Sequence, residues 1–507
     1  MTRVLLITPY GFENQGVRML SAVLRQEGFD APILYMKAWR NNDIQPPTDR
    51  ELDLFDRLIR QQDPDVIGIG FGTPYLRIVT ELTQRVRAVS GAHVIWGGVH
   101  PTISPEDCID HADSVCIGEG ELPLLDLARA IRDGESADAI PNLWVRRADG
   151  IRRNPPRPLI QDLDTLPYGH QLLGAEMFVI EDDKLVARDP SIDNVMYRIH
   201  ASRGCPFQCA FCYNSQYREI YSGLGKYHRT RTVENVLQEI ELARTVRPGL
   251  KRIRFDDDSF VYPRAWIEEF CREYPRRVGL RFDILLNPTT AKESTLRALR
   301  DVGLDHVQVG IQAGSDEERE KQYKRKGSNA DTLALAQMLA DIGIDVTYDV
   351  ILDNPLSSRA DKQAMLDLLL DLPRPYNLFL YSLVVFPKSF TATTLMAAGV
   401  IGEDDVEGIA TKSFEQFRLT LDYPRPTEDT FYACLISMAS KGFIPRSAVR
   451  ALARSDTLRA HPTALRYGAE AANAVKLGTV AMKMLRRGEL SVFKLAEYAS
   501  FRRRLIQ

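Results

Sequence analysis

The sequence lacks a long apolar run. No stretch reaches the roughly 18 consecutive apolar residues that a membrane-spanning helix requires. The apolar start Val4–Ile7 is soon broken by Pro9 and is too short for the core of a secretory signal peptide. With 44% hydrophobic and 26% charged residues, the composition is that of an ordinary globular protein. We therefore expect a cytoplasmic protein without a membrane span.

Net charge and cysteine are also scarce. The formal net charge is −3 over 507 residues, so we expect no general attraction to nucleic acid. The seven cysteines are an odd number, and three of them crowd into the eight residues from Cys205 to Cys212. In a reducing compartment, such clustering favours metal binding over disulfide bonds.

Short apolar runs alternate with amphipathic helical stretches along the first part of the chain. This alternation predicts an α/β domain over residues 1–140, with a Rossmann-like parallel sheet and helices on both faces. Sheets of this kind bind ligands at the loops that follow their strands. The expected strands are Val4–Thr8, Ala31–Tyr35, Val66–Gly70, His93–Trp96 and Ser114–Ile117.

Three further regions follow. Residues 141–190 predict a linker, because prolines punctuate them and no helical period persists. Over residues 191–395 the alternation returns as six strand–helix units, which predicts a partial (β/α)6 barrel of the TIM type. Helical patterns dominate residues 396–507, where we expect a helical C-terminal domain with a basic tail.

Three cysteines with the spacing C-x3-C-x2-C follow the first expected barrel strand. They are Cys205, Cys209 and Cys212. Three thiolates in a tight loop can hold one four-iron cluster and leave one iron open to a small molecule with an amine and a carboxylate. A zinc site is the alternative, but zinc usually takes four protein ligands, and no fourth Cys or His lies at a zinc-like spacing. Three buried cysteines without a role are the remaining alternative. We therefore predict an iron–sulfur cluster on these three residues.

The triplet, with an aromatic residue before its last cysteine, resembles that of the radical S-adenosylmethionine (SAM) superfamily. The resemblance covers roughly residues 195–390. It implies a 4Fe-4S cluster whose open iron binds SAM, and an external electron donor such as flavodoxin or ferredoxin. Reduction then cleaves a carbon–sulfur bond of SAM to give a 5′-deoxyadenosyl radical. The resemblance also implies that Phe211 and Tyr213, beside the last cysteine, contact the cofactor.

Later strand ends supply further SAM positions by the same resemblance. Asp257 and Asp258 match an Asp-Asp-x-Phe segment, although aspartates at a strand end also commonly cap helices. Gln312 stands where related proteins often have glutamate, so it implies a neutral contact to a cofactor hydroxyl. Arg325 is placed to pair with the cofactor carboxylate. A basic helix end favoured by the helix dipole is the alternative for Arg325.

Two glycine-rich loops follow the fourth and fifth expected strands. They read Gly97-Gly98-Val99-His100-Pro101-Thr102 and Gly118-Glu119-Gly120-Glu121. Glycines allow the backbone to approach a bulky ligand closely, and no G-x-G-x-x-G follows the first strand to favour a dinucleotide. The loops resemble those of cobalamin-binding radical SAM enzymes over residues 1 to about 390. The cobalamin contacts that this resemblance implies are Thr8, Tyr10, Gly11, Thr73, Tyr75, Gly97, Gly98, His100, Pro101, Thr102, Gly118, Glu119 and Gly120.

One motif of some cobalamin domains is missing. No Asp-x-His-x-x-Gly occurs to supply a histidine to cobalt, so the residue beneath the corrin is expected from the loop of residues 71–75. A degenerate domain that only supports the fold is the alternative. We also expect Gly97, Gly98 and Gly118 to be required as glycines, because a side chain at these positions would fill space that the ligand needs.

The combined resemblance implies a cobalamin-dependent radical SAM enzyme. We expect a C-methyltransferase that moves a methyl group from methylcobalamin to an unactivated carbon of a small-molecule substrate. Cyclases of magnesium-protoporphyrin ester and ring-contracting enzymes share this architecture without methyl transfer, so they remain an alternative. A cobalamin sensor without turnover is a further alternative, which the intact cysteine triplet disfavours.

The cluster assignment leads to a direct prediction. Cys205→Ala, Cys209→Ala and Cys212→Ala should each abolish the reductive cleavage of SAM, because each removes a thiolate ligand of the cluster. Cys271→Ala is the matched control and should leave cleavage intact. Release of 5′-deoxyadenosine under anaerobic conditions is the measurement. A triple variant that still releases it would refute the assignment.

Overall fold

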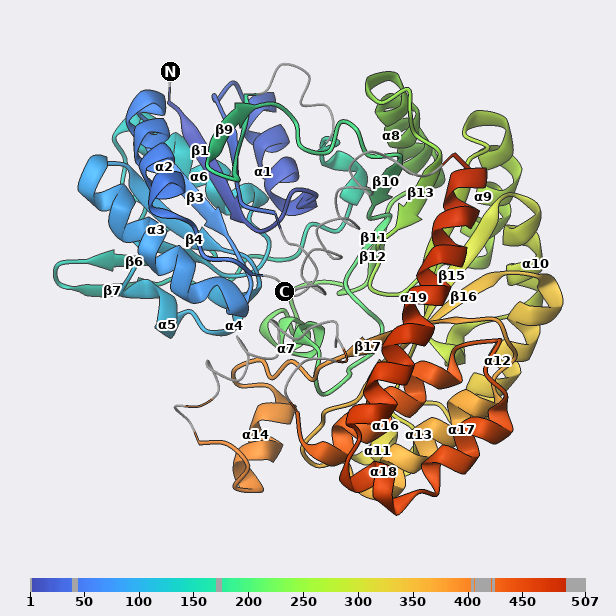
Figure 1. The fold of residues 1–507 in the computed structure, drawn as a ribbon. Coiled ribbons are helices and arrows are strands. Elements are labelled where there is room, and N and C mark those ends of the chain that lie inside the picture. Colours follow the sequence, from blue (N-terminus) through green and yellow to red (C-terminus); the bar gives the residue numbers. More distant parts are fainter. Residues whose placement is uncertain are drawn as a thin grey trace.

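Two α/β lobes lie side by side in the computed structural model, which describes residues 2–38, 44–169, 176–402, 405, 421 and 425–488. Figure 1 shows the N-terminal lobe in blue and cyan, the second lobe in green to yellow, and the C-terminal helices in red against the second lobe. The loops between the lobes, where the ends of several strands meet, are the region of functional interest.

The N-terminal lobe is a nine-stranded sheet in the order β7-β6-β5-β4-β3-β1-β2-β8-β9. Its parallel centre confirms the predicted Rossmann-like arrangement. Successive residues of β1 enter opposite cores: Val4 and Leu6 pack with α1 and α6, and Leu5 and Ile7 with α2 and α3. A strand buried on both faces is therefore apolar throughout. The elements are β1 (Val4–Pro9), α1 (Gln15–Gln26), β2 (Ile33–Met36), α2 (Asp49–Gln62), β3 (Val66–Gly70), η1 (Thr73–Tyr75), α3 (Leu76–Val89), β4 (His93–Gly97), α4 (Val99–Ile103), α5 (Glu106–Ile109), β5 (Ser114–Cys116) and α6 (Glu121–Asp133).

The prediction that residues 141–190 form a linker without regular structure is wrong. This region supplies strands to both edges of the N-terminal sheet. The hairpin of β6 (Leu143–Arg147) and β7 (Gly150–Arg153) extends the sheet beside β5. β8 (Met177–Glu181) pairs in parallel with β2, and β9 (Lys184–Ala187) follows it. Their runs of four or five residues between prolines are too short to show a clear period. The short helix η2 (Leu163–Thr165) lies between these two pairs of strands.

The second lobe is a six-stranded sheet whose strands are all parallel and follow chain order. Strands β10 and β17 stand at its edges, so the barrel is partial, as predicted. The strands are β10 (Met196–Ile199), β13 (Arg252–Phe255), β14 (Arg281–Leu286), β15 (Leu304–Gln312), β16 (Asp345–Ile351) and β17 (Asn377–Tyr381). The other elements are β11 (Ser202–Arg203), α7 (Tyr213–Ile220), β12 (Arg229–Thr230), α8 (Val233–Val246), α9 (Arg264–Arg277), η3 (Pro288–Thr290), α10 (Glu293–Asp301), α11 (Asp316–Lys321), α12 (Asn329–Ile342) and α13 (Arg359–Asp371).

The described part of the C-terminal region is helical, as predicted. Its longest helix, α19, runs along the second lobe in Figure 1. Arg487, just beyond α19, pairs with Asp305 at 2.9 Å, and Lys483 pairs with Asp345, so the helix is anchored to the barrel strands. The basic tail beyond residue 488 lies outside the described residues. The helices are α14 (Phe390–Ala397), α16 (Thr427–Ala439), α17 (Arg446–Ala453), α18 (Asp456–Ala460) and α19 (Thr463–Arg486).

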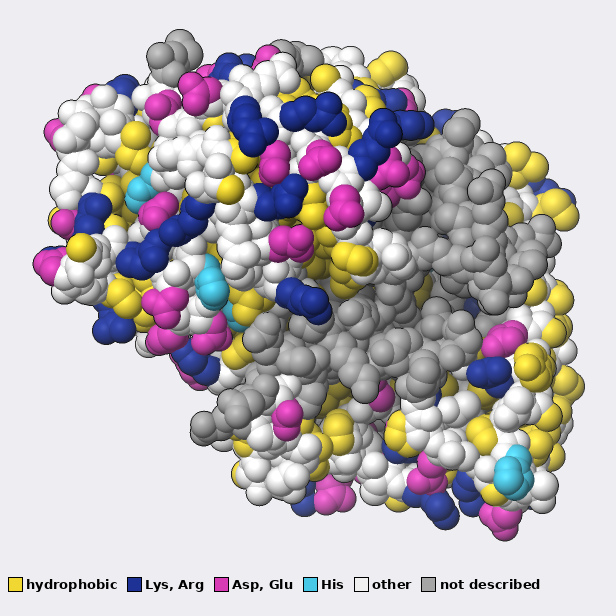
Figure 2. All heavy atoms as spheres, turned by 60° about the vertical axis from the view of Figure 1, so that its left-hand side comes forward, with side chains coloured by type: hydrophobic (Ala, Val, Ile, Leu, Met, Phe, Trp, Pro, Cys, Tyr) yellow, Lys and Arg dark blue, Asp and Glu magenta, His cyan; other side chains and the backbone are white. Residues whose placement is uncertain are grey.

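Surface charge is mixed on the face that Figure 2 shows. Lys and Arg side chains are interspersed with Asp and Glu over the N-terminal lobe, in agreement with the small net charge. Among the helices of the described ranges, none combines the length and the apolar character needed to cross a membrane.

Candidate active site between the two lobes

A cavity of about 640 Å³ lies where the two lobes meet. One end of the cavity lies at the crevice between β1 and β3. The strand order reverses at this point, because β2 lies on one side of β1 and β3 lies on the other. Crevices of this kind are where parallel α/β sheets bind ligands. The N-terminal wall consists of the loops after β1, β3, β4 and β5. The barrel wall consists of His200, Arg203, Tyr213, Tyr217, Arg231 and Glu239.

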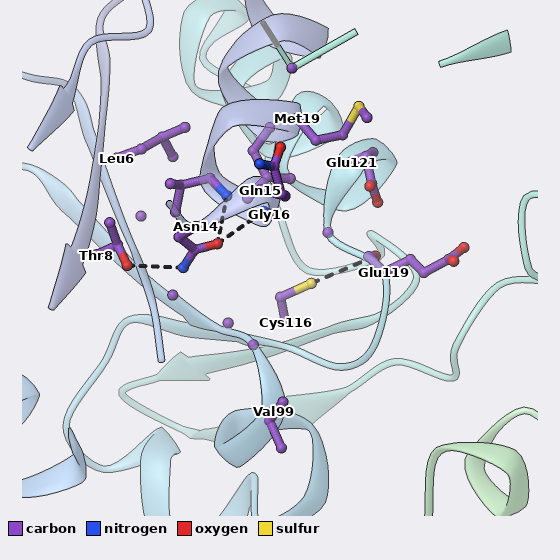
Figure 3. A pocket seen from close by; sticks show the side chains of 18 of the residues that line it. Leu6, Thr8, Asn14, Gln15, Gly16, Met19, Val99, Cys116, Glu119 and Glu121 are labelled. Atoms are coloured by element: carbon purple, nitrogen blue, oxygen red, sulfur yellow. Dashed lines mark hydrogen bonds between the residues drawn. The ribbon is translucent and has the colours of Figure 1, made fainter. Parts of the chain in front are cut away.

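The cavity continues as an apolar slot between the sheet and helices α1 and α6. Gly68 and Gly70 of β3 face this slot without side chains. A Cβ at Gly68 would lie 3.0 Å from Leu6 Cδ2, and one at Gly70 3.7 Å from Val17 Cγ1, so larger residues would fill the space. Figure 3 shows α1, with Asn14 and Met19, on one side of the cavity and the β5 loop, with Cys116 and Glu119, on the other. The slot is thus lined mainly by apolar side chains and by these two glycines.

Most of the predicted cobalamin residues line the cavity. Tyr10, with a left-handed φ of 54°, stacks on Tyr75 at a ring-centroid distance of 5.1 Å, so the β1 and β3 loops share one aromatic surface. The Thr8 hydroxyl accepts a hydrogen bond from Asn14 Nδ2 at 2.9 Å. The predicted residues on the wall are Thr8, Tyr10, Gly11, Tyr75, Gly97, Gly98, Gly118, Glu119 and Gly120.

Four of the predicted residues lie behind this wall: Thr73, His100, Pro101 and Thr102 are buried and do not line the cavity. The His100 side chain is hydrogen-bonded through Nδ1 to Thr73 Oγ1 at 3.1 Å, and burial lowers the pKa of His100 to about 4. The Thr102 hydroxyl donates to Gly98 O at 2.7 Å and accepts from Gly118 N at 2.9 Å. The structure thus places these residues as supports of the two glycine loops.

The two glycine loops need glycine for a different reason from the one expected. Gly98 has φ of 99°, and a Cβ there would lie 2.7 Å from Phe71 O. Gly118 has φ of 84°, and its Cβ would overlap the Tyr221 hydroxyl. Both positions are therefore restricted by the protein itself and by backbone conformation. At Gly97 the nearest atom to a Cβ is Cys116 Cβ at 3.7 Å, an ordinary contact.

Helix α7, which begins directly after Cys212, packs on these glycine loops. The Tyr217 hydroxyl donates to Gly98 O at 3.3 Å. The Tyr221 hydroxyl accepts from Glu119 N at 2.8 Å. The element that follows the cysteine loop therefore touches the loops that form the other wall of the cavity.

A group of four charged residues joins the β5 loop to the β11–β12 ribbon; Glu121 and Arg229 are buried, and Glu119 and Arg203 are partly buried. Arg203 pairs with Glu119 at 3.2 Å and with Glu121 at 2.6 Å, and Arg229 pairs with Glu119 at 2.9 Å. Burial raises the pKa of Glu119, but the two arginines outweigh it and hold that pKa below its ordinary value. Glu119 was predicted to contact cobalamin; it lines the cavity, and its carboxylate pairs with two arginines of the barrel lobe. The sequence signal was available, because two glutamates two residues apart need a cationic partner when buried.

The cysteine loop lies between β11 and α7. Cys205 and Cys209 are buried and Cys212 is partly buried. Arg325 Nη1 donates to Cys209 Sγ at 3.5 Å, and Asn214 Nδ2 donates to Cys212 Sγ at 3.7 Å. Thiol sulfurs that already receive N–H donors suit an iron–sulfur cluster, whose sulfurs accept such bonds.

Burial raises the pKa of Cys205 to about 11 and that of Cys212 to about 12. These thiols must therefore lose protons when they bind iron. Among the residues that the structure describes, no three His, Cys, Asp or Glu side chains form a group that could hold a single metal ion. The cluster assignment rests on the loop sequence and on the donors aimed at its sulfurs.

The two predicted aspartates differ in their environment. Asp257 is buried, and its carboxylate accepts from Ser202 N and Ser202 Oγ at 2.6 Å each and from the Tyr262 hydroxyl at 3.0 Å. Protein donors thus engage both of its oxygens, and its role is to fix β11 before the cysteine loop. Asp258 is exposed at the end of β13, with the Tyr213 hydroxyl 3.5 Å away. Asp258 is the one of the pair that remains open to a ligand.

Gln312 and Arg325 lie together over Gly310. A Cβ at Gly310 would be 2.7 Å from Gln312 Nε2 and 3.0 Å from Arg325 Nη2. Arg325 Nη2 donates to Gly310 O at 2.7 Å, so this arginine links the end of β15 to the cysteine loop. Gln312 has φ of 68° at an irregularity in the pairing of β15 with β16. Phe211 packs edge-on against Tyr323 at 5.2 Å.

Several wall residues were missed by the sequence analysis. His200, just after β10, is exposed and lines the cavity. Arg231 and Glu239 line it nearby and pair at 2.5 Å. A histidine at the carboxyl end of a barrel strand is a signal of functional position, whereas the Arg231–Glu239 pair depends on the packing of α8.

Two family models match the chain, in the order that the two lobes predict. Residues 3–128 match the B12 binding domain, and residues 199–368 match the radical SAM superfamily. The chain therefore contains a B12-binding domain followed by a radical SAM domain, and these two domains imply a 4Fe-4S cluster, SAM and cobalamin as cofactors.

The curated relatives carry more than one activity in their names. An uncharacterized methyltransferase of Pyrococcus horikoshii is 30% identical over 51% of this chain and 54% of the relative. An anaerobic magnesium-protoporphyrin IX monomethyl ester cyclase of Rubrivivax gelatinosus is 27% identical over 61% and 55%. A hopanoid C-3 methylase of Methylococcus capsulatus is 24% identical over 67% and 61%. The aligned part of the chain spans about half the length of the first two relatives.

Solved structures share the fold over most of the chain. A radical SAM methyltransferase from Kitasatospora setae, TsrM, superposes with a TM-score of 0.62 at 16% identity, covering 93% of this chain and 100% of that chain. The cobalamin-dependent radical enzyme OxsB gives a TM-score of 0.57 at 16% identity, covering 83% and 57%. These identities establish the two-lobed fold alone.

Substitution of the loop glycines should affect both lobes. Gly118→Ala should displace Tyr221 and cost about 1 kcal/mol or more from the left-handed backbone alone. We expect loss of cobalamin together with weaker SAM cleavage, read from the visible spectrum and from 5′-deoxyadenosine release. Gly28→Ala is the matched control, since Gly28 has a similar φ of 83° and a Cβ there would meet no atom within 4 Å. A Gly118→Ala protein with full SAM cleavage and an unchanged melting temperature would contradict this explanation.

A second prediction concerns Gln312. If its amide binds a cofactor hydroxyl, Gln312→Ala removes a neutral contact worth about 0.5–1.5 kcal/mol. SAM affinity, measured by equilibrium dialysis, should then fall roughly tenfold at most. The left-handed backbone strain is similar for both residues, so it does not complicate the comparison. A loss of several hundredfold would show that this contact is not a simple neutral hydrogen bond.

Proposed function

We propose that the chain is a cobalamin-dependent radical SAM enzyme, a C-methyltransferase that acts on an unactivated carbon of a small-molecule substrate. The observation that carries the proposal is a single cavity bordered by both lobes. Its N-terminal wall is formed by the β1, β3, β4 and β5 loops, and its barrel wall includes Tyr213, next to Cys212. Methyl transfer to a substrate radical needs both cofactors to face one chamber, and this arrangement supports that requirement.

Each wall then has a defined task. When bound, the cluster with SAM supplies the 5′-deoxyadenosyl radical, and cobalamin supplies the methyl group. Cys205, Cys209 and Cys212 would hold the cluster, and Arg325 would steady Cys209 through its hydrogen bond to the sulfur. Asp258, which is exposed beside Tyr213, would face the bound SAM. Holding the reactants in fixed geometry within one enclosed space is itself a large contribution to rate.

The N-terminal wall fits cobalamin. The apolar slot beside Gly68 and Gly70 supports binding of the flat benzimidazole at the end of the cobalamin tail. The stacked Tyr10 and Tyr75 rings would form the floor beneath the corrin. Among the described residues that line the cavity, the sole histidine is His200, on the barrel wall. This supports a cobalt site without a histidine from the N-terminal domain.

The supporting partners follow from the chemistry. Reductive cleavage of SAM needs an electron, so we propose an external donor such as a flavodoxin or ferredoxin. A cluster with an accessible iron is sensitive to oxygen, and thiols stay reduced in the cytoplasm, which we propose as the location.

A second candidate is a cyclisation or ring rearrangement without methyl transfer. The observation in its favour is the likeness to the magnesium-protoporphyrin ester cyclase of Rubrivivax gelatinosus, at 27% identity. The two candidates share the cluster, SAM and cobalamin, and they differ in their products.

Anaerobic turnover distinguishes these candidates. With reductant and a pool of candidate metabolites, a methyltransferase should release S-adenosylhomocysteine and 5′-deoxyadenosine together, and one metabolite should gain the mass of one methylene unit. The measurement is mass spectrometry, with Cys209→Ala protein as the control. Release of 5′-deoxyadenosine without S-adenosylhomocysteine would reject methylation and favour the second candidate. Absence of both products from cluster-loaded protein would favour a sensor without turnover.

A further inference from the structure

Arg203 belongs to two sites at once. Its backbone lies in β11, opposite Arg229 of the antiparallel strand β12. Arg203 is two residues before Cys205, so β11 leads directly into the cysteine loop. Its side chain crosses to the other lobe and binds Glu119 and Glu121. Asp257 holds the preceding residue, Ser202, through two hydrogen bonds. The backbone of Arg203 is thus fixed to the barrel, and its guanidinium is fixed to the β5 loop.

The β5 loop is also a wall of the proposed cobalamin site. Gly118, Glu119, Gly120 and Glu121 all line the cavity. A ligand seated against this wall therefore contacts the same four-residue segment whose carboxylates hold Arg203. If the β5 loop moves when its ligand binds, Arg203 moves with it, and this changes the backbone position just before Cys205.

Tyr221 provides a second, independent connection. It lies on the segment that continues from α7, nine residues after Cys212. Its hydroxyl accepts the Glu119 backbone N–H at 2.8 Å and fills the space above Gly118. The cysteine loop is therefore joined to the β5 loop on both of its sides, by Arg203 before it and by Tyr221 after it.

We propose that Arg203 and Tyr221 are positioning residues that couple the two cofactor sites, so that filling one site raises the affinity of the other. The inference rests on the proposed cobalamin and cluster sites but not on methyl transfer. Thermodynamic linkage requires that the effect be reciprocal: in cluster-loaded protein, cobalamin must change SAM affinity by the same factor by which SAM changes cobalamin affinity.

The test measures these affinities on the full chain. Cobalamin binding is titrated through the visible spectrum on cluster-loaded protein, without and with SAM. SAM binding is titrated on cluster-loaded protein with and without cobalamin. We expect both ratios in the wild-type protein to agree and to be at least about fivefold.

Two variants identify the residues responsible. Tyr221→Phe removes only the hydroxyl that accepts Glu119 N–H, and it should reduce both ratios. Arg203→Gln alone would leave Glu121 buried without its partner, so it is combined with Glu121→Gln, which removes both charges together. In this double variant we expect both ratios to fall below about twofold.

The matched control is Arg18→Gln. Arg18 is a buried arginine that pairs with Asp189 at 2.5 Å and hydrogen-bonds Ser191, neither of which belongs to the glycine loops or the cysteine loop. Its loss should leave the coupling ratios unchanged. Equal affinities in the wild-type protein, coupling that persists in Tyr221→Phe and in the double variant, or coupling that is lost equally in Arg18→Gln would each overturn the proposal. Wild-type protein that binds no cobalamin at all would instead overturn the proposed function, and the coupling with it.

Discussion

The whole arrangement depends on one constraint, which is that both lobes present the carboxyl ends of parallel strands to the same space. Backbone at a strand end is free of the sheet ladder, so loops there can carry ligand-binding groups. The β1, β3, β4 and β5 loops and the segment after β10 satisfy this constraint together. A largely buried group formed by Arg203, Arg229, Glu119 and Glu121 then fixes the two lobes relative to each other. Such a group contributes modest net stability, because burial costs each charge its hydration, but its geometry is specific.

The sequence alone was sufficient for the order of the two α/β domains, whereas the assignment of the cysteine triplet to a cluster stays a prediction. The alternation of strands and helices along the chain predicts parallel sheets. The C-x3-C-x2-C spacing lies within one loop, so it can be recognised without knowledge of the fold. The identity of the wall residues was harder to predict. His100 and Thr102 belong to a glycine-rich motif, but they lie behind it, because α4 begins at Val99 and turns their side chains into the core. Motif position therefore located the loop without showing which side chains face the ligand.

Residues whose role depends on the other lobe could not be found from sequence spacing. Glu119 and Arg203 are 84 residues apart, and Tyr221 lies 102 residues from the amide it contacts. The reason that Gly118 must be glycine likewise lies in a distant tyrosine. Asp257 shows the converse case: its place in the motif was recognised, but only the structure shows that Ser202 and Tyr262 already engage its carboxylate.

The strands contributed by residues 141–190 determine where the N-terminal domain can be separated from the rest. β8 covers the open edge of β2, and β6 covers that of β5. A fragment ending near residue 140 would expose both edges, with Leu34 and Met36 on one of them, as templates for intermolecular strand pairing and aggregation. The smallest autonomous folding unit of this domain therefore extends through β9, to residue 187, and the strands that protect both edges of its parallel core come from a segment that carries no ligand-binding motif.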